Sequence, residues 1–176
     1  MIENLLITKI TNEDVEEVFN IEKLIHPQHH WSKDSFFNEI ANNLARYFCV
    51  KDTNNKILAF IGFWVILEEA HITTLGTHPD FRNNQLAQTL LIQCIKTCYK
   101  EMVKYITLEV RESNVPAINL YEKFGFSSIG MRKNYYQDNG ENAIIMFTQN
   151  IWYDSFKNNF QELKENIKKV SVSYVE

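Results

Sequence analysis

Residues 72–110 read ITTLGTHPDFRNNQLAQTLLIQCIKTCYKEMVKYITLEV, and this stretch decides the fold. Both ends have the composition of β-strands, whereas the middle repeats apolar residues every three or four positions, as a helix does. The helical stripe comprises Ala87, Leu90, Leu91, Cys94, Ile95, Cys98 and Met102. A strand, a long helix and a second strand predict a parallel crossover, because the helix returns the chain to the end of the sheet where the first strand began.

The sequence before this crossover predicts two helices and an antiparallel meander. Leu5, Ile7 and Ile10 are spaced as in a first strand, and a helix ending at Ile25 follows. Ser32 caps a second helix after a loop rich in histidine. Strands are predicted over residues 47–50, 57–67 and 70–77, with turn-forming residues 52–55 between the first two.

The sequence after the crossover predicts a short helix and a hairpin. Asn114 caps a helix that runs to Phe124 and is closed by Gly125. Residues 126–135 and 143–148 flank a turn containing Asp-Asn-Gly. The predicted fold class is α/β of the α+β type: helices flank a mixed, mainly antiparallel central sheet that contains one parallel β-α-β crossover.

The length of 176 residues favours one domain over residues 1–150 with an extension over residues 151–176. The extension predicts an amphipathic helix with a heptad-like apolar stripe. The stripe comprises Phe156, Phe160, Leu163, Ile167, Val170 and Tyr174. It either packs back on the domain or forms a homodimer or partner contact.

Composition and charge narrow the function classes. The net charge of -4 offers no overall positive field to nucleic-acid phosphates. The longest apolar stretch, residues 57–67, is shorter than the roughly 20 residues that cross a bilayer. Three cysteines form no even disulfide framework, and the first residues lack the order of an export signal. We expect a cytoplasmic protein that binds neither nucleic acid directly nor a membrane.

Three features can carry chemistry. The turn of residues 82–87 begins the long helix, and the free N–H groups of a helix start suit a phosphate, although every helix has such an end. Glu109 lies in the middle of a predicted strand. On a central strand its carboxylate must be paired or line a wet cleft, whereas on an edge strand it is simply solvated. Tyr121 shares the apolar face of the short helix, so a core aromatic is its alternative role. The histidines within residues 26–30 lack a matched ligand cluster, and no metal site is expected.

Taken together, these segments resemble the GCN-five-related N-acetyltransferase (GNAT) family, and within it the RimI type, which acetylates the N-terminal alanine of a small-subunit ribosomal protein. The resemblance covers most of residues 5–150. It is carried by Glu69-Ala70-His71-Ile72, His78-Pro79-Asp80-Phe81-Arg82, Ile106-Thr107-Leu108-Glu109-Val110-Arg111, Asn119-Leu120-Tyr121-Glu122-Lys123-Phe124-Gly125-Phe126 and Arg132-Lys133-Asn134-Tyr135-Tyr136. It implies the GNAT fold and acetyl-coenzyme A (acetyl-CoA) as co-substrate.

The resemblance also implies a cofactor site. The resemblance implies that the main chain of Leu75, Gly76 and Thr77 binds the pantetheine arm of acetyl-CoA. It also implies that the turn at the start of the long helix binds the pyrophosphate and that Asn114 contacts the cofactor. The turn comprises Arg82, Asn83, Asn84, Gln85, Leu86 and Ala87. The family pattern is Arg-x-x-Gly-x-Gly or Ala, so Gln85 replaces the middle glycine. Since glycine lets a backbone approach a phosphate closely, Gln85 either adopts an ordinary helical conformation or contributes its own amide donor.

The same resemblance implies that Glu109 is the general base and Tyr121 the acid that protonates the departing thiolate. The resemblance further implies that the peptide lies between Trp31 and the final hairpin at Tyr135 and Tyr136. Glu69 and other surface acids, Glu68, Asp138 and Glu141, either attract a basic ribosomal tail or are ordinary solvated acids. The competing functions are a lysine or small-molecule amine acetyltransferase and a non-catalytic acyl-CoA-binding factor associated with the ribosome.

Overall fold

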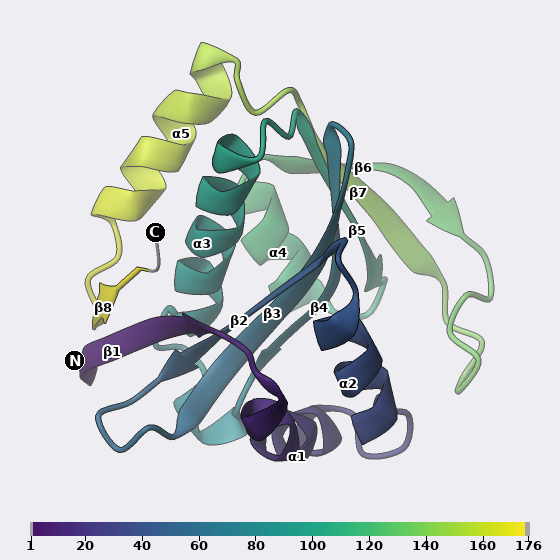
Figure 1. Cartoon of the computed structure of the whole chain (residues 1–176). Coiled ribbons are helices and arrows are strands. Elements are labelled where there is room, and N and C mark those ends of the chain that lie inside the picture. Colours follow the sequence, from purple (N-terminus) through teal and green to yellow (C-terminus); the bar gives the residue numbers. More distant parts are fainter. Residues whose placement is uncertain (1, 175–176) are drawn as a thin grey trace.

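The computed structural model describes residues 2–174, which form one mixed sheet with helices on both faces (Figure 1). The strands are β1 (Ile2–Lys9), β2 (Ala45–Lys51), β3 (Ile57–Ile66), β4 (Glu69–Thr77), β5 (Tyr105–Arg111), β6 (Phe126–Arg132), β7 (Ala143–Thr148) and β8 (Val170–Ser173). The helices are α1 (Val15–Ile25), α2 (Lys33–Ala41), α3 (Leu86–Lys100), α4 (Val115–Lys123) and α5 (Asp154–Glu165), with single 3-10 turns at Asn12–Asp14 and Pro79–Phe81.

The sheet confirms the predicted fold class. Its strand order is β6-β7-β5-β4-β3-β2-β1-β8. β2, β3 and β4 form the expected antiparallel meander, and β4 and β5 run parallel on either side of the α3 crossover. β6 and β7 form the expected hairpin, in which β7 also pairs with β5.

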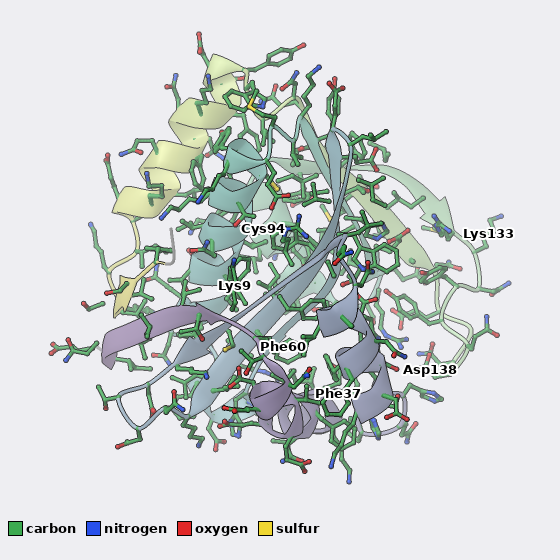
Figure 2. The ribbon with its side chains drawn as sticks, in the orientation of Figure 1. Lys9, Phe37, Phe60, Cys94, Lys133 and Asp138 are labelled. Carbon is green, nitrogen blue, oxygen red and sulfur yellow. The ribbon has the colours of Figure 1, made fainter. Side chains whose placement is uncertain are left out.

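Two apolar layers enclose the sheet. Beneath α1 and α2, buried residues such as Val18 and Phe36 pack on Phe60 of β3. On the other face α3, α4 and α5 share one larger cluster that includes Cys94. Figure 2 labels Phe60 and Cys94, which mark the two layers. In the described residues, no helix combines the length and the apolar composition that crossing a membrane requires.

Local signals in the sequence account for the start of α2 and the end of α4. The Ser32 hydroxyl accepts a hydrogen bond from the Ser35 N–H at 3.1 Å, as a helix N-cap does. Gly125 follows α4 with φ of 86°, a conformation that glycine adopts without a Cβ clash. Met102 departs from the prediction: it lies beyond the end of α3, with φ of 61° and 65% of its surface exposed, so it is not part of the buried stripe.

The C-terminal extension corrects the prediction of a helix through Tyr174. α5 ends at Glu165, and residues 170–173 form β8, which pairs in parallel with β1. The physical reason is that Val170, Val172 and Tyr174 also alternate with a period of two, and β1 offers an unpaired edge. Phe156, Phe160, Leu163 and Val170 are buried in the cluster that contains α3, so the stripe packs back on the same chain.

Candidate active site

The sheet opens where β4 and β5 stop pairing. β5 pairs with β4 only from Tyr105 to Leu108, opposite Glu69–Ile72. β4 continues to Thr77 and keeps its ladder with β3 on the other side. In the described chain, the edge of residues 73–77 that faces β5 therefore has no strand partner and is free to bond an extended ligand.

A groove of about 1010 Å³ occupies this opening, a volume typical of small-molecule sites. Among the residues predicted for the site, it is lined by Trp31, Leu75, Gly76, Thr77, Arg82, Asn83, Gln85, Leu86, Ala87, Glu109, Asn114, Tyr121, Tyr135 and Tyr136. Two predicted residues do not line it. Asn84 donates its side-chain amide to the Phe81 and Arg82 carbonyls, and Glu69 lines a separate hollow.

Glu109 is the first residue of β5 beyond its pairing with β4, and its carboxylate contacts two basic side chains. One oxygen lies 2.7 Å from His71 Nε2, and the other lies 3.1 Å from a guanidinium nitrogen of Arg132. The hydrogen bond from His71 lowers the pKa of Glu109, against the opposing effect of burial, and the charges of His71 and Arg132 lower it further. Glu109 is therefore an ionised carboxylate that faces the groove and can accept a proton.

Tyr121 projects from α4 and is both a core aromatic and a groove residue. Its side chain is buried, and its ring centroid lies 5.6 Å from that of Phe126. Burial raises the pKa of Tyr121 well above its ordinary value, and the neighbouring Tyr136 and Cys94 add to the shift. The phenol is therefore protonated at neutral pH and available as a donor.

The turn that begins α3 holds two residues in the left-handed region. Asn83 has φ of 63° and Gln85 has φ of 62°, a conformation that costs roughly 1–2 kcal/mol for a residue with a Cβ. The prediction of an ordinary helical conformation for Gln85 is thus wrong, and its amide donates to the Asn166 carbonyl at 3.0 Å. Within residues 2–174, the backbone N–H groups of residues 83–88 donate to no acceptor of the chain, which suits an anion.

Another part of the groove lining is formed by Tyr135 and Tyr136, on a loop that Arg111 holds through two carboxylates. The Arg111 guanidinium lies 3.8 Å from the Tyr136 ring centroid and donates to Asp138 at 2.8 Å. Arg111 also donates to Glu141 at 3.3 Å. Asp138, labelled in Figure 2 on the loop between β6 and β7, is therefore engaged within the protein. Its carboxylate and that of Glu141 fix the loop that carries Tyr135 and Tyr136.

Sequence reasoning missed three groups around this groove. His71 and Arg132 both occur in the quoted motifs, but only strand pairing shows that they meet at Glu109. The third is Glu22 of α1, which is buried and accepts a hydrogen bond from the Trp31 N–H at 3.4 Å. Its burial raises the pKa of Glu22, against the charges of His26 and His30. The histidines within residues 26–30 were the sequence signal that Glu22 could be buried, because a buried carboxylate needs basic or hydrogen-bonding partners.

The fold and this groove define an acyltransferase site, and comparison with known proteins agrees. A model of the acetyltransferase (GNAT) family matches residues 10–126, and the chain belongs to this family. It is an N-acetyltransferase of the RimI type, as its motifs predict.

The most informative relatives are bacterial. An Escherichia coli ribosomal protein bS18-alanine N-acetyltransferase is 36% identical over 143 residues, which cover 80% of this chain and 94% of that protein. A Bacillus subtilis protein provisionally given the same name is 37% identical over 135 residues, 77% of this chain and 89% of its own length. The crystal structure of the E. coli ribosomal-protein-S18-alanine N-acetyltransferase superposes with a TM-score of 0.76 at 31% identity, over 83% of this chain and 94% of that one.

Proposed function

We propose that this enzyme transfers the acetyl group of acetyl-CoA to the N-terminal α-amine of a ribosomal protein that begins with alanine. The names of its relatives support this acceptor. The observation that carries the proposal is the position of Glu109: its paired carboxylate faces the groove at the point where β4 and β5 separate.

The groove fits acetyl-CoA in two places. The N–H groups of residues 83–88 suit the pyrophosphate, with Arg82 beside them. The free edge of residues 73–77 suits the amides of the pantetheine arm, because an extended chain can add to an unpaired strand edge. Bound there, the thioester supplies an activated acetyl group.

Glu109 removes a proton from the incoming amine. An α-amine with a pKa near ~8 is easier to deprotonate than lysine near ~10.4, by roughly 3 kcal/mol at one pH. Because the pKa of Glu109 is lowered, the carboxylate is ionised, and it accepts the proton of the amine directly or through a water molecule.

Tyr121 donates a proton to the departing thiolate. From ordinary values near ~10 and ~8.5, this transfer is uphill by about 2 kcal/mol. Burial raises the pKa of Tyr121 further in the free enzyme, so the donation must accompany cleavage of the carbon–sulfur bond and not precede it.

Two acceptor peptides and a reaction without acceptor test the proposal by release of free thiol from acetyl-CoA. We expect release with a basic peptide that begins with alanine, and none with the same peptide N-blocked but containing lysine or without acceptor. Release with the blocked peptide indicates lysine acetylation. Binding of acetyl-CoA without release in any of the three indicates an acyl-CoA-binding factor.

We also propose that the enzyme acts in the cytoplasm. The cysteines Cys49, Cys94 and Cys98 are all free and buried, which a reducing compartment favours. Burial raises the pKa of Cys49 to about 11, so that thiol is unreactive. Labelling with a thiol reagent before and after unfolding tests their state in protein taken from cells.

A further inference from the structure

The side chain of Gln85 bonds to the backbone of the C-terminal segment. Its Oε1 accepts hydrogen bonds from the N–H groups of Lys168 at 2.9 Å and Lys169 at 2.8 Å. Its Nε2 donates to the Asn166 carbonyl at 3.0 Å. The amide of Gln85 is thus bonded through both its donor and its acceptor to residues 166–169, which we name the tail brace.

The tail brace also reaches the other strained residue of the turn. Lys169 Nζ donates to the Asn83 carbonyl at 2.8 Å. Asn83 and Gln85 are the two residues of the turn with positive φ. Both left-handed residues of the turn are therefore bonded to the tail brace, Gln85 through its side chain and Asn83 through its carbonyl.

The tail brace is fixed to the domain on both sides. Before it, Leu163 of α5 is buried in the main core cluster. After it, β8 pairs with β1, and Ile2 donates its N–H to the Lys169 carbonyl at 3.1 Å. Residues 166–169 do not line the groove, whereas Asn83 and Gln85 do. The tail brace therefore contacts the turn without lining the groove.

We propose that Gln85 is a positioning residue through which the tail brace holds the cofactor-binding turn in its left-handed conformation. The family pattern places a glycine here, which adopts this conformation without strain. In this chain, glutamine and its three bonds to the tail replace glycine, and they hold the turn in the conformation that leaves the N–H groups of residues 83–88 without a partner in the described chain. The inference rests on the proposed use of acetyl-CoA.

Substitutions at Gln85 test this role. Titration calorimetry with acetyl-CoA gives Kd, and steady-state kinetics give KM and kcat. Gln85→Ala keeps a Cβ but loses all three bonds, so we expect Kd and KM for acetyl-CoA to rise about tenfold while kcat stays within about twofold. Gln85→Gly removes the strain together with the bonds and should bind more tightly than Gln85→Ala. Gln161→Ala, which removes an exposed glutamine of α5 whose bonds stay on that helix, is the matched control and should bind as the parent does.

Wild-type affinity in Gln85→Ala, or a fall of kcat without a change of KM, overturns the proposal. Hydrogen exchange on the unsubstituted enzyme gives a second test that needs no variant. Because coupling is reciprocal, acetyl-CoA should slow exchange of the Lys168 and Lys169 amides, although neither residue lines the groove. Protection of residues 83–88 without any change at these two amides also overturns it.

The proposed function is judged separately from the tail brace. If the enzyme binds acetyl-CoA but leaves the alanine peptide unmodified, the proposed acceptor fails and the brace is decided by Kd and exchange alone. If the parent enzyme does not bind acetyl-CoA, both proposals are wrong.

Discussion

Glu109 concentrates the proposed proton chemistry in one carboxylate. Glu109→Gln keeps the shape of the side chain but removes its basicity, and we expect kcat/KM to fall about 10²- to 10³-fold. The acidic limb of the pH profile should disappear, because the ionised form of Glu109 is the active one. The measurement is kcat/KM for an alanine peptide from pH 9 down to the lowest pH at which the enzyme stays folded, because the lowered pKa of Glu109 places the limb below pH 4.5. An unchanged acidic limb assigns the base to another group.

His71 lowers the pKa of Glu109 through its hydrogen bond, which is the shorter of the two contacts of that carboxylate. His71→Leu removes the largest cause of the lowered pKa, so the pKa of Glu109 rises and activity is lost at a higher pH on acidification. Arg132→Leu is the matched comparison and should move the limb less, since the charge of Arg132 is the smallest of the causes. Equal shifts in the two variants contradict this order.

Tyr121 is a suitable residue for an isosteric test, because its ring packs against Phe126 and only its hydroxyl has the proposed chemical role. Tyr121→Phe should fold normally, lower kcat about 10²-fold and leave KM for acetyl-CoA within about twofold. Steady-state kinetics with both substrates varied checks this. Unchanged turnover removes the acid role.

The family motifs selected Glu109 and Tyr121 as candidates, whereas physical patterns left their roles open. Glu109 and Tyr121 stand in quoted motifs and line one groove, yet periodicity alone left a solvated acid and a core aromatic as alternatives. The partners of Glu109 could not be predicted, because His71 is separated from it by the whole α3 crossover. A contact of that kind depends on strand pairing, which a local pattern does not contain.

Among the elements, α3 and α5 show what helical periodicity can decide. The stripe on α3 predicted a buried helix correctly from Ala87 to Cys98, because every turn supports it. The stripe after α5 was ambiguous, since Leu163, Ile167 and Val170 fit a helix while Val170, Val172 and Tyr174 fit a strand. The unpaired edge of β1 decides for the strand, and that edge is distant in sequence.

α5 is a stabilising part of the domain, and this can be measured. Phe156 is 2% exposed and its ring faces Gly125 at the end of α4. Phe156→Ala should lower the free energy of unfolding by about 3–5 kcal/mol, the usual cost of removing a buried phenylalanine. Tyr153→Ala, at a residue that is 57% exposed beside the same helix, should change it by less than about 1 kcal/mol. Urea unfolding followed by circular dichroism compares the two.

At the scale of the whole molecule, one sheet both forms the groove and binds the C-terminal strand. Its centre opens between β4 and β5 to form the groove, while its outer edge is closed by β8 (Figure 1). The tail brace links the two, because it lies between α5 and β8 and contacts the turn that lines the groove. A loss of stability at the C-terminal end should therefore weaken cofactor binding before it unfolds the sheet.

Acid stability of the whole molecule follows from its paired carboxylates. Hydrogen bonds with Ser113, including one from its backbone N–H, lower the pKa of Glu141 to about 2 from an ordinary 4.5. A group whose pKa is lower in the folded state stabilises the protein above its unfolded pKa and loses this effect as the pH falls through the folded value. Glu141→Gln should therefore be less stable than the parent at pH 6, and the gap should close between about pH 4.5 and 2. The measurement is the urea midpoint of both proteins across this pH range. If the difference between the two midpoints stays constant down to pH 2, Glu141 stabilises the loop by packing and not by its charge.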